Sequence, residues 1–260
     1  MEIRGSKVLV TGASSGIGAA LALQLAEQGA TVGLVARRAD RLAEVLEATQ
    51  RHSPDSRRWV ADLGDTELAE RVALEAWEAF GHLDCLVNNA GVPMRRTTAE
   101  LDYETLEWVM RVNFLAPARM MMAVLPGMLE RGEGLIVNVS SVAGRLGNPN
   151  EAAYSASKFA LCGWSEATAV DLWDTGVKIR LVNPGPIDTE IWDLPNNDDP
   201  LYDGPKISAE EMAQGIIAAM EGDQFEHYVP DMKSFVEAKT ADPDPFLAGM
   251  ADFLRNAKGS

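Results

Sequence analysis

The chain has 260 residues, 47% of them hydrophobic, and its 23 Lys and Arg against 39 Asp and Glu give a net charge of −16 at pH 7. Such a charge is repelled by nucleic acid and by anionic membrane surfaces, which we therefore exclude as partners. No stretch of sequence approaches the ~18 apolar residues of a membrane span. The segment before the first apolar run is too short for a signal peptide. We expect a single domain over residues 1–260 in the cytoplasm.

Seven short β-branched runs alternate with helix-length segments along the chain. An order of strand, helix and strand predicts a parallel sheet with right-handed crossovers and helices on both faces. This is the α/β, doubly wound Rossmann fold, with a seven-stranded, mainly parallel sheet. The predicted strands are Lys7–Val10, Thr31–Val35, Arg58–Ala61, Asp84–Val87, Gly134–Val139, Val177–Val182 and Glu226–Val229.

A glycine-rich turn, Thr11–Gly18, joins the first strand to the first helix. Glycines at this spacing allow a tight turn and a close approach of the backbone to a pyrophosphate, and the helix N-terminus offers free N–H groups. A turn that binds nothing is the alternative. The residues predicted to bind a dinucleotide here are Gly12, Ser14, Ser15, Gly16, Ile17 and Gly18.

Two arginines, Arg37 and Arg38, follow the second strand, where NAD-binding proteins of this fold place an acidic residue against the adenosine ribose. A guanidinium binds a 2′-phosphate through paired hydrogen bonds, which a carboxylate would repel. We therefore favour NADP(H) over NAD(H) as cofactor. The alternative is that both arginines cap a helix or lie in solvent.

A tyrosine is followed by a lysine four residues later at Tyr154 and Lys158, within a helical run from Glu151 to Asp171. Positions i and i+4 share a helix face. An ammonium beside a phenol would lower the tyrosine pKa from ~10 toward neutrality and make Tyr154 a general acid/base. The same spacing at Tyr202 and Lys206 contains Gly-Pro, which excludes a regular helix there.

Taken in order, the motifs of this chain resemble the short-chain dehydrogenase/reductase family, in its classical subgroup. The resemblance covers nearly the whole chain. It implies that Tyr154 is the general acid/base, that Lys158 lowers its pKa and holds the nicotinamide ribose, that Ser141 bonds the reacting oxygen, and that Asn113 holds a relay water. The matching motifs are Thr11-Gly12-x-x-x-Gly16-x-Gly18, Asp62-Leu63, Asn88-Asn89-Ala90-Gly91, Asn113, Ser141, Tyr154-x-x-x-Lys158, and Pro184-Gly185 followed by Ile187 and Thr189.

The resemblance also implies a set of further cofactor contacts. Asp62 and Leu63 would meet the adenine, and Ile187 and Thr189 would contact the nicotinamide carboxamide. The remaining residues implied to shape the cofactor site are Asn89, Ala90, Gly91, Pro184 and Gly185, together with Tyr154 and Lys158 themselves.

An acidic, proline-containing stretch, residues 188–207, follows these motifs. We expect either a substrate lid or a solvated surface loop, because long loops in compact domains are often functional or mobile. The pocket walls are expected near Val92, Leu146, Pro186 and Trp192, which predicts a mostly apolar substrate. Arg95 and Arg96 either border this pocket or belong to a solvated loop, and we favour the loop.

Several other residues bear on partners and metals. Trp164 and Trp173 lie on the predicted helix of Tyr154, which in the resembled family packs into a subunit interface, so we expect a homodimer or homotetramer. Burial of both tryptophans against the sheet is the alternative. The histidines and the two cysteines, Cys85 and Cys162, share no ligand spacing, so no metal is predicted.

We interpret the chain as an NADP(H)-dependent oxidoreductase that moves a hydride between the nicotinamide and a small-molecule carbonyl or secondary alcohol. The alternative is a non-catalytic NADP(H)-binding regulatory or sensor protein, because fold does not fix function. The intact Ser141, Tyr154 and Lys158 argue against a sensor.

Overall fold

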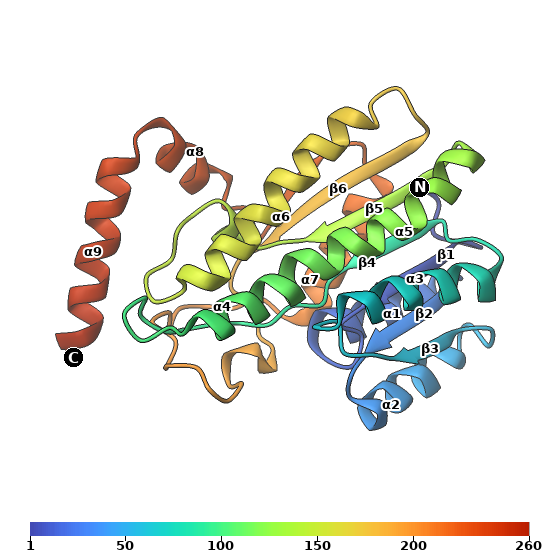
Figure 1. Cartoon of the computed structure of the whole chain (residues 1–260), viewed down its shortest axis with the longest axis horizontal. Helices are drawn as coiled ribbons and strands as arrows, with labels where there is room; N and C mark the ends of the chain where they lie inside the picture. The colour runs from blue at the N-terminus through green and yellow to red at the C-terminus, as the bar shows by residue number, and fades with distance from the viewer. Residues whose placement is uncertain (260) are drawn as a thin grey trace.

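The computed structural model describes residues 1–259 as a seven-stranded sheet with helices on both faces (Figure 1). The strand order is β3-β2-β1-β4-β5-β6-β7, and every neighbouring pair is parallel. The predicted doubly wound Rossmann fold is confirmed. The strands are β1 Lys7–Thr11, β2 Thr31–Ala36, β3 Arg57–Val60, β4 Cys85–Asn88, β5 Gly134–Val139, β6 Val177–Pro184 and β7 Glu226–Val229.

The helices fill the segments between the predicted strands. Helix α1 ends just before Gly29, whose φ of +91° lies in the left-handed region that glycine adopts without strain. The helices are α1 Gly16–Glu27, α2 Ala39–Gln50, α3 Thr66–Phe80, α4 Tyr103–Met110, α5 Ala116–Arg131, α6 Ala152–Asp171, α7 Ala209–Glu221, α8 Lys233–Ala241 and α9 Pro243–Gly259, with a π-helical turn η1 Arg111–Leu115 and the 3₁₀ turns η2 Val142–Gly144 and η3 Glu190–Trp192.

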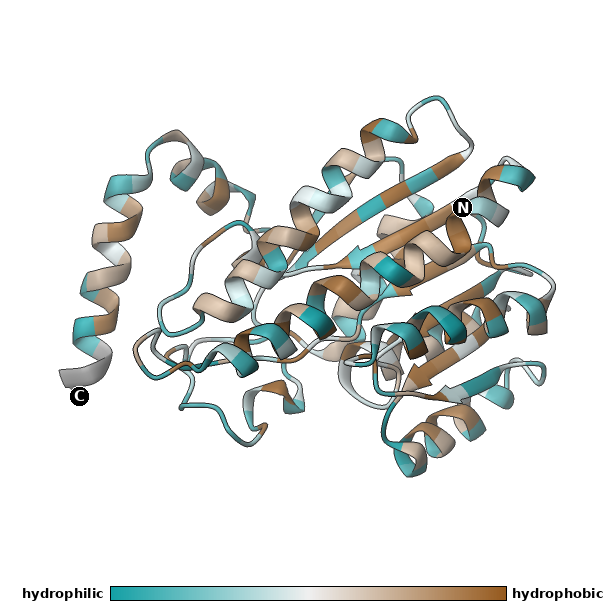
Figure 2. Cartoon of the chain, in the orientation of Figure 1, coloured by the Kyte–Doolittle hydropathy of each residue, from teal (hydrophilic) through white to brown (hydrophobic). Residues whose placement is uncertain are grey.

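Both faces of the sheet are buried, which is why its central strands are mostly apolar (Figure 2). Val8 and Val10 of β1 pack under α1, α2 and α7, whereas Leu9 between them packs under α3 and α5 on the other face. The methionines of α5 belong to this second core layer, with Met120 fully buried, although Met122 is exposed.

One helical run, Tyr103–Arg131, joins α4, η1 and α5 without a break. By length and composition alone it is apolar enough to cross a membrane, with a mean hydropathy of 1.3, so the expectation that no stretch approaches this limit was wrong. Half of its apolar window is buried inside the protein, and α5 packs directly on the sheet through Met120 and Val124. A core helix passes the same test of length and composition.

The carboxyl ends of the parallel strands indicate where a ligand site is expected. The chain runs from β1 outward to β3 and then crosses back to β4, so the strand order reverses between β1 and β4. In open α/β sheets, ligands bind in the crevice at such a switch point, outside the carboxyl ends of the strands. The glycine turn after β1 and Ser141 after β5 both lie at this edge.

We predict that Gly176→Ala destabilises the protein by about 3 kcal/mol, because an added methyl carbon would overlap the backbone carbonyl of Gly132, which cannot rotate away. Gly147→Ala is the control, since that position has no atom within 4 Å of the added carbon, and its effect should stay within about 0.5 kcal/mol. Urea unfolding at pH 7 measures both. Equal midpoints for the two variants would contradict the packing argument.

Candidate active site

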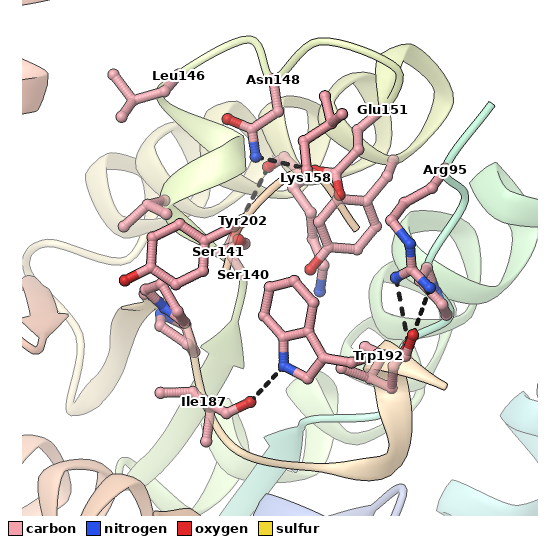
Figure 3. A pocket seen from close by; sticks show the side chains of 18 of the residues that line it. Arg95, Ser140, Ser141, Leu146, Asn148, Glu151, Lys158, Ile187, Trp192 and Tyr202 are labelled. Carbon is pink, nitrogen blue, oxygen red and sulfur yellow. Dashed lines mark hydrogen bonds between the residues drawn. The ribbon is translucent and has the colours of Figure 1, made fainter. Parts of the chain in front are cut away.

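Three of the predicted catalytic residues meet at the carboxyl end of β5 (Figure 3). Ser141 directly follows β5 and begins the turn η2, where its hydroxyl accepts a hydrogen bond from the Ala143 N–H at 3.1 Å. Tyr154 and Lys158 lie on the first turns of α6, which packs against η2. The Lys158 Nζ donates to the Val139 carbonyl at 3.0 Å and lies 5.8 Å from the Tyr154 ring centroid.

Burial sets the protonation of this pair. Burial raises the pKa of Tyr154 to about 12, although hydrogen bonding with Ser141 opposes the rise, and burial lowers the pKa of Lys158 to about 8. The expected shift of the tyrosine pKa toward neutrality is thus not found, because the effect of burial on the phenol is larger and opposite in direction. The physical reason is that loss of water disfavours both charged forms by more than any attraction between them favours those forms.

Asn113 lies in the π-helical turn η1 and is fully buried. Its Oδ1 accepts from the Val92 N–H at 2.8 Å, and its Nδ2 donates to the Val92 carbonyl at 3.0 Å and to the Ser157 Oγ at 3.0 Å. Ser157 in turn donates to the Tyr154 carbonyl at 2.7 Å. The asparagine thus connects the loop after β4 to the turn of α6 that carries the tyrosine.

The glycine turn has the geometry that a dinucleotide phosphate requires. Gly12 and Gly16 have φ values of +70° and +52°, in the left-handed region. A side chain at Gly18 would overlap the Gly12 carbonyl, so the helix can approach the strand this closely only with glycine there. Helix α1 has no side-chain cap at Ser15 and no acidic residue in its first turn, so no group of the helix itself offsets its N-terminal dipole. These residues fit a bound phosphate.

Of the two predicted arginines, Arg38 reaches this turn, whereas Arg37 is exposed. Arg38 donates through Nη2 to the Ser14 Oγ at 3.1 Å and to the Ser15 Oγ at 2.6 Å. Both serines named by the sequence are therefore held beside a guanidinium.

A carboxylate from the 188–207 segment already contacts these groups. Glu190 accepts from the Ser15 Oγ at 2.7 Å, pairs with Arg38 at 2.5 Å and also pairs with Arg41. These hydrogen bonds, that of Arg38 foremost, lower the pKa of Glu190 to about 2. The sequence had placed Glu190 only in an acidic loop, and no local pattern indicated this contact.

The loop after β4 packs against the end of β1. The Asn89 Nδ2 donates to the Thr11 carbonyl at 2.9 Å, and the Ala90 N–H donates to the Thr11 Oγ1 at 3.0 Å. A methyl carbon on Gly91 would lie 3.5 Å from the Lys158 Nζ. These three residues therefore lie between the glycine turn and Lys158.

The segment after β6 reaches the same place from the other side. Pro184, Gly185 and Ile187 line the cavity with Tyr154, and a methyl carbon on Gly16 would lie 3.0 Å from the Thr189 Cγ2. Asp62 and Leu63 lie apart from this cavity, after β3. The Asp62 Oδ1 accepts from the Gly64 N–H at 2.9 Å, and Leu63 is buried.

A cavity of about 430 Å³ extends from Ser141 and Tyr154 beneath the 188–207 segment. Leu146, Pro186 and Trp192 line it, as expected. Val92 does not, because it is buried in a separate apolar cluster. Its neighbour Pro93 lines the cavity instead.

The expectation that Arg95 belongs to a solvated loop was wrong, because its side chain is 5% exposed and lines the cavity. The guanidinium donates to the Trp192 carbonyl at 2.7 Å (Figure 3). It also donates to the Asp198 carbonyl at 2.9 Å, and the Arg95 N–H donates to the Asn197 Oδ1 at 2.8 Å. Arg95 therefore fixes the 188–207 segment over the cavity. No sequence motif marked it.

The far wall of the cavity comes from α8 and α9, where no motif of the resembled family was recognised in the sequence. Phe246, Met250 and Phe253 recur on α9 at intervals of four and three, which is the signal of one apolar helix face. Helix α9 stands away from the body of the fold (Figure 1), and Phe253 is 40% exposed. No three His, Cys, Asp or Glu side chains within residues 1–259 are arranged to hold a metal ion.

Comparisons with known proteins agree with this geometry. A family model described as short chain dehydrogenase matches residues 6–199. Ketoacyl reductase HetN of Nostoc sp. is 36% identical over 183 residues, 70% of this chain and 64% of that protein. The 3-ketodihydrosphingosine reductase of Bos taurus is 35% identical over 206 residues, 77% of this chain and 62% of that protein. The chain thus spans somewhat less than two thirds of the length of these relatives.

Solved structures extend the likeness. A short chain dehydrogenase of Burkholderia cenocepacia in complex with NADP has a TM-score of 0.81 and 31% identity, covering 96% of this chain and 99% of that one. A short chain dehydrogenase/reductase of Burkholderia phymatum in complex with NAD has a TM-score of 0.85 and 26% identity, covering 94% and 96%. The chain belongs to the short-chain dehydrogenase/reductase family, and both of these solved structures hold a nicotinamide dinucleotide.

We predict that Lys158→Met changes the pH dependence of stability. The pKa of Lys158 is about 8 in the folded protein and about 10.5 in the unfolded chain, so the unfolded chain binds more protons between these values and wild-type stability rises with pH there. Relative to the variant, the wild type should gain about 1–3 kcal/mol between pH 8 and 10.5. Denaturant unfolding at several pH values measures this. A constant difference between the two proteins would refute the lowered pKa.

Proposed function

We propose that this chain is an NADP(H)-dependent oxidoreductase that transfers a hydride between the nicotinamide and a carbonyl or secondary alcohol carbon. The observation that carries the proposal is the convergence of Ser141, Tyr154 and Lys158 on one cavity, at the sheet edge that also holds the glycine turn. A hydroxyl, a phenol and an ammonium at that edge are the groups needed to move a proton to or from a reacting oxygen.

The bound nicotinamide would supply or accept the hydride. In the reductive direction the Tyr154 hydroxyl donates its proton to the carbonyl oxygen, and in the oxidative direction the phenolate takes the proton from the alcohol. The Ser141 hydroxyl, which opposes the raised pKa of Tyr154, orients the same oxygen. Lys158 stabilises the phenolate and holds the ribose. Asn113 holds α6 against the loop after β4 through Ser157 and Val92, and it binds the relay water.

Tyr154→Phe should reduce kcat by about 10²–10⁴-fold, because the general acid/base is removed while the ring stays in place. Affinity for NADPH should stay near the wild-type value. NADPH absorbance against a panel of ketones and aldehydes measures the first, and fluorescence titration measures the second.

Wild-type turnover by this variant would refute the role of Tyr154. NADPH binding by the wild-type protein without oxidation of NADPH across the panel would favour a sensor over an enzyme.

The proposed preference for NADP(H) rests on the positively charged Arg37 and Arg38 near the glycine turn. We propose that Arg37 and Arg38, with Ser14 and Ser15, hold the adenosine phosphate, and that the backbone of Gly12, Gly16, Ile17 and Gly18 approaches the pyrophosphate. Asp62 and Leu63 would meet the adenine. The residues proposed to complete the nicotinamide end are Asn89, Ala90, Gly91, Pro184, Gly185, Ile187 and Thr189.

We propose that residues 188–207 form a substrate lid within a single domain. Glu190 joins this lid to Ser15, Arg38 and Arg41, which are the groups proposed to bind or border the phosphate. An incoming phosphate must then compete with the Glu190 carboxylate, because both anions use the same donors.

Arg38→Ala and Arg37→Asp should each lower the preference for NADPH over NADH by about tenfold or more, since hydrogen bonds to charged groups contribute ~1.5–3 kcal/mol. Glu190→Gln should act in the opposite direction and tighten NADPH binding, because it releases the guanidinium groups. Arg51→Ala, at the far end of α2, is the control. Fluorescence titration with both dinucleotides gives the ratios. Unchanged ratios in both arginine variants would remove the assignment to NADP(H).

We also propose a homodimer or homotetramer in the cytoplasm. The expectation that Trp173 lies on the helix of Tyr154 was wrong, because α6 ends at Asp171. In support of the oligomer, Val170 on the last turn of α6 and Trp173 just past its end are 71% and 76% exposed, so this region presents apolar surface to solvent. Trp164 differs, because it packs inward against Phe114 with ring centroids 6.1 Å apart. Of the two tryptophans considered, only Trp173 is available to a second subunit.

A further inference from the structure

Two acidic residues, Glu151 and Asp199, line the otherwise mostly apolar cavity. Asp199 is exposed in the 188–207 segment, whereas Glu151 is half-buried and close in sequence to Tyr154. Glu151 is the residue before α6 and lies three positions from Tyr154, so the two side chains start from neighbouring places on the same helix end. Burial raises its pKa, and the charge of Glu151 in turn contributes to the raised pKa of Tyr154. The carboxylate therefore lies within electrostatic reach of the reacting oxygen.

The backbone holds Glu151 in a fixed position. Residue 151 forms an isolated β-bridge with Arg96, and the Arg96 N–H donates to the Asn150 carbonyl at 2.6 Å. The Ser155 N–H donates to the Glu151 carbonyl at 2.8 Å. The carboxylate is thus presented to the cavity by a rigid segment, as a recognition group needs to be.

Its charge is not balanced by the protein. Within the described part of the chain, the one hydrogen bond to the Glu151 carboxylate comes from the Asn148 Nδ2 at 2.9 Å, and no Lys, Arg or His lies within 4.0 Å of it. Arg95 is the cation that acts on it from a distance, but its guanidinium donates to lid carbonyls (Figure 3). A half-buried carboxylate with one hydrogen bond is poorly compensated.

The rest of the cavity is suited to hydrocarbon. Trp192 and Tyr202 of the lid line it with their rings 6.4 Å apart, and Phe246, Met250 and Phe253 of α9 line its outer end. The match to the family model ends at residue 199, and α9 follows it in the chain. This wall of the cavity is therefore formed by residues outside the matched region. An apolar chain of the substrate would replace water on these side chains.

We propose that the preferred substrates are amphiphilic amino alcohols and the matching amino ketones, whose ammonium group binds Glu151 and whose apolar chain extends toward α9. This inference rests on the proposed function, since it concerns the substrate of the same site. An ammonium on the carbon next to the reacting one would supply the hydrogen bonds and the positive charge that Glu151 lacks.

The test compares three secondary alcohols with NADP⁺ at pH 7.5. 1-Aminodecan-2-ol carries the ammonium, decane-1,2-diol carries a neutral donor, and undecan-3-ol has a methyl group in its place. Each oxidation moves a hydride from the carbinol carbon to NADP⁺ and releases the hydroxyl proton, so absorbance at 340 nm gives kcat/KM. The amino alcohol should exceed undecan-3-ol by about tenfold or more. 1-Aminopropan-2-ol, which lacks the chain, should fall at least about tenfold below 1-aminodecan-2-ol.

Glu151→Gln identifies the group responsible. The variant keeps the shape and the Asn148 contact but loses the charge, so the ratio of kcat/KM for 1-aminodecan-2-ol over undecan-3-ol should fall to near one. Asp193→Asn removes one acidic charge from the lid at an exposed position outside the cavity and should keep the wild-type ratio.

The outcomes separate the two proposals. Oxidation of all three long-chain alcohols with equal kcat/KM, or an equal ratio in wild type and Glu151→Gln, would overturn the amino-group inference while leaving the oxidoreductase in place. Absence of any turnover with these alcohols, and with the ketone panel in reverse, would overturn the proposed function itself.

Discussion

The hydrogen bond from the Lys158 ammonium to the last carbonyl of β5 is the contact on which the site depends. It joins α6 to the carboxyl edge of the sheet and fixes the turn of helix that carries Tyr154 beside Ser141. The cost of burying an ammonium is offset only in part by one carbonyl, and the lowered pKa of Lys158 is the sign of that imbalance. A negatively charged group that binds beside Lys158 would therefore stabilise its ammonium form.

Similar imbalances occur elsewhere around the cavity. Among the residues that the structure describes, no carboxylate lies within 4.0 Å of the buried Arg95 guanidinium, which donates to backbone carbonyls. In the same part of the chain, no cation lies within 4.0 Å of the half-buried Glu151 carboxylate, which accepts from an amide. Arg95 and Glu151 do not pair with each other, because the Arg95 guanidinium donates to carbonyls of the 188–207 segment. Such unpaired buried groups cost stability, and they are the groups that a bound ligand can satisfy. At the glycine turn the charged groups are paired, because Glu190 forms ion pairs with both Arg38 and Arg41.

The 188–207 segment, which we propose as the lid, contacts both of these regions. Its start contacts the glycine turn through Thr189 and Glu190, and its middle is fixed over the cavity by Arg95. The lid also packs on itself, with the Lys206 Nζ 4.4 Å from the Trp192 ring centroid. One short segment therefore contacts both the glycine turn and the cavity beside Tyr154.

The sequence by itself determined the fold, because strand and helix periodicities and a glycine turn are local patterns that repeat along the chain. It also determined that Ser141, Tyr154 and Lys158 come together, since the i, i+4 spacing and the end of a strand are local as well. Only the tertiary structure decided the pKa direction of Tyr154, the burial of Arg95 and the pairing of Glu190 with Arg38. These depend on desolvation and on contacts between residues about 100 or more positions apart, for which no local pattern exists.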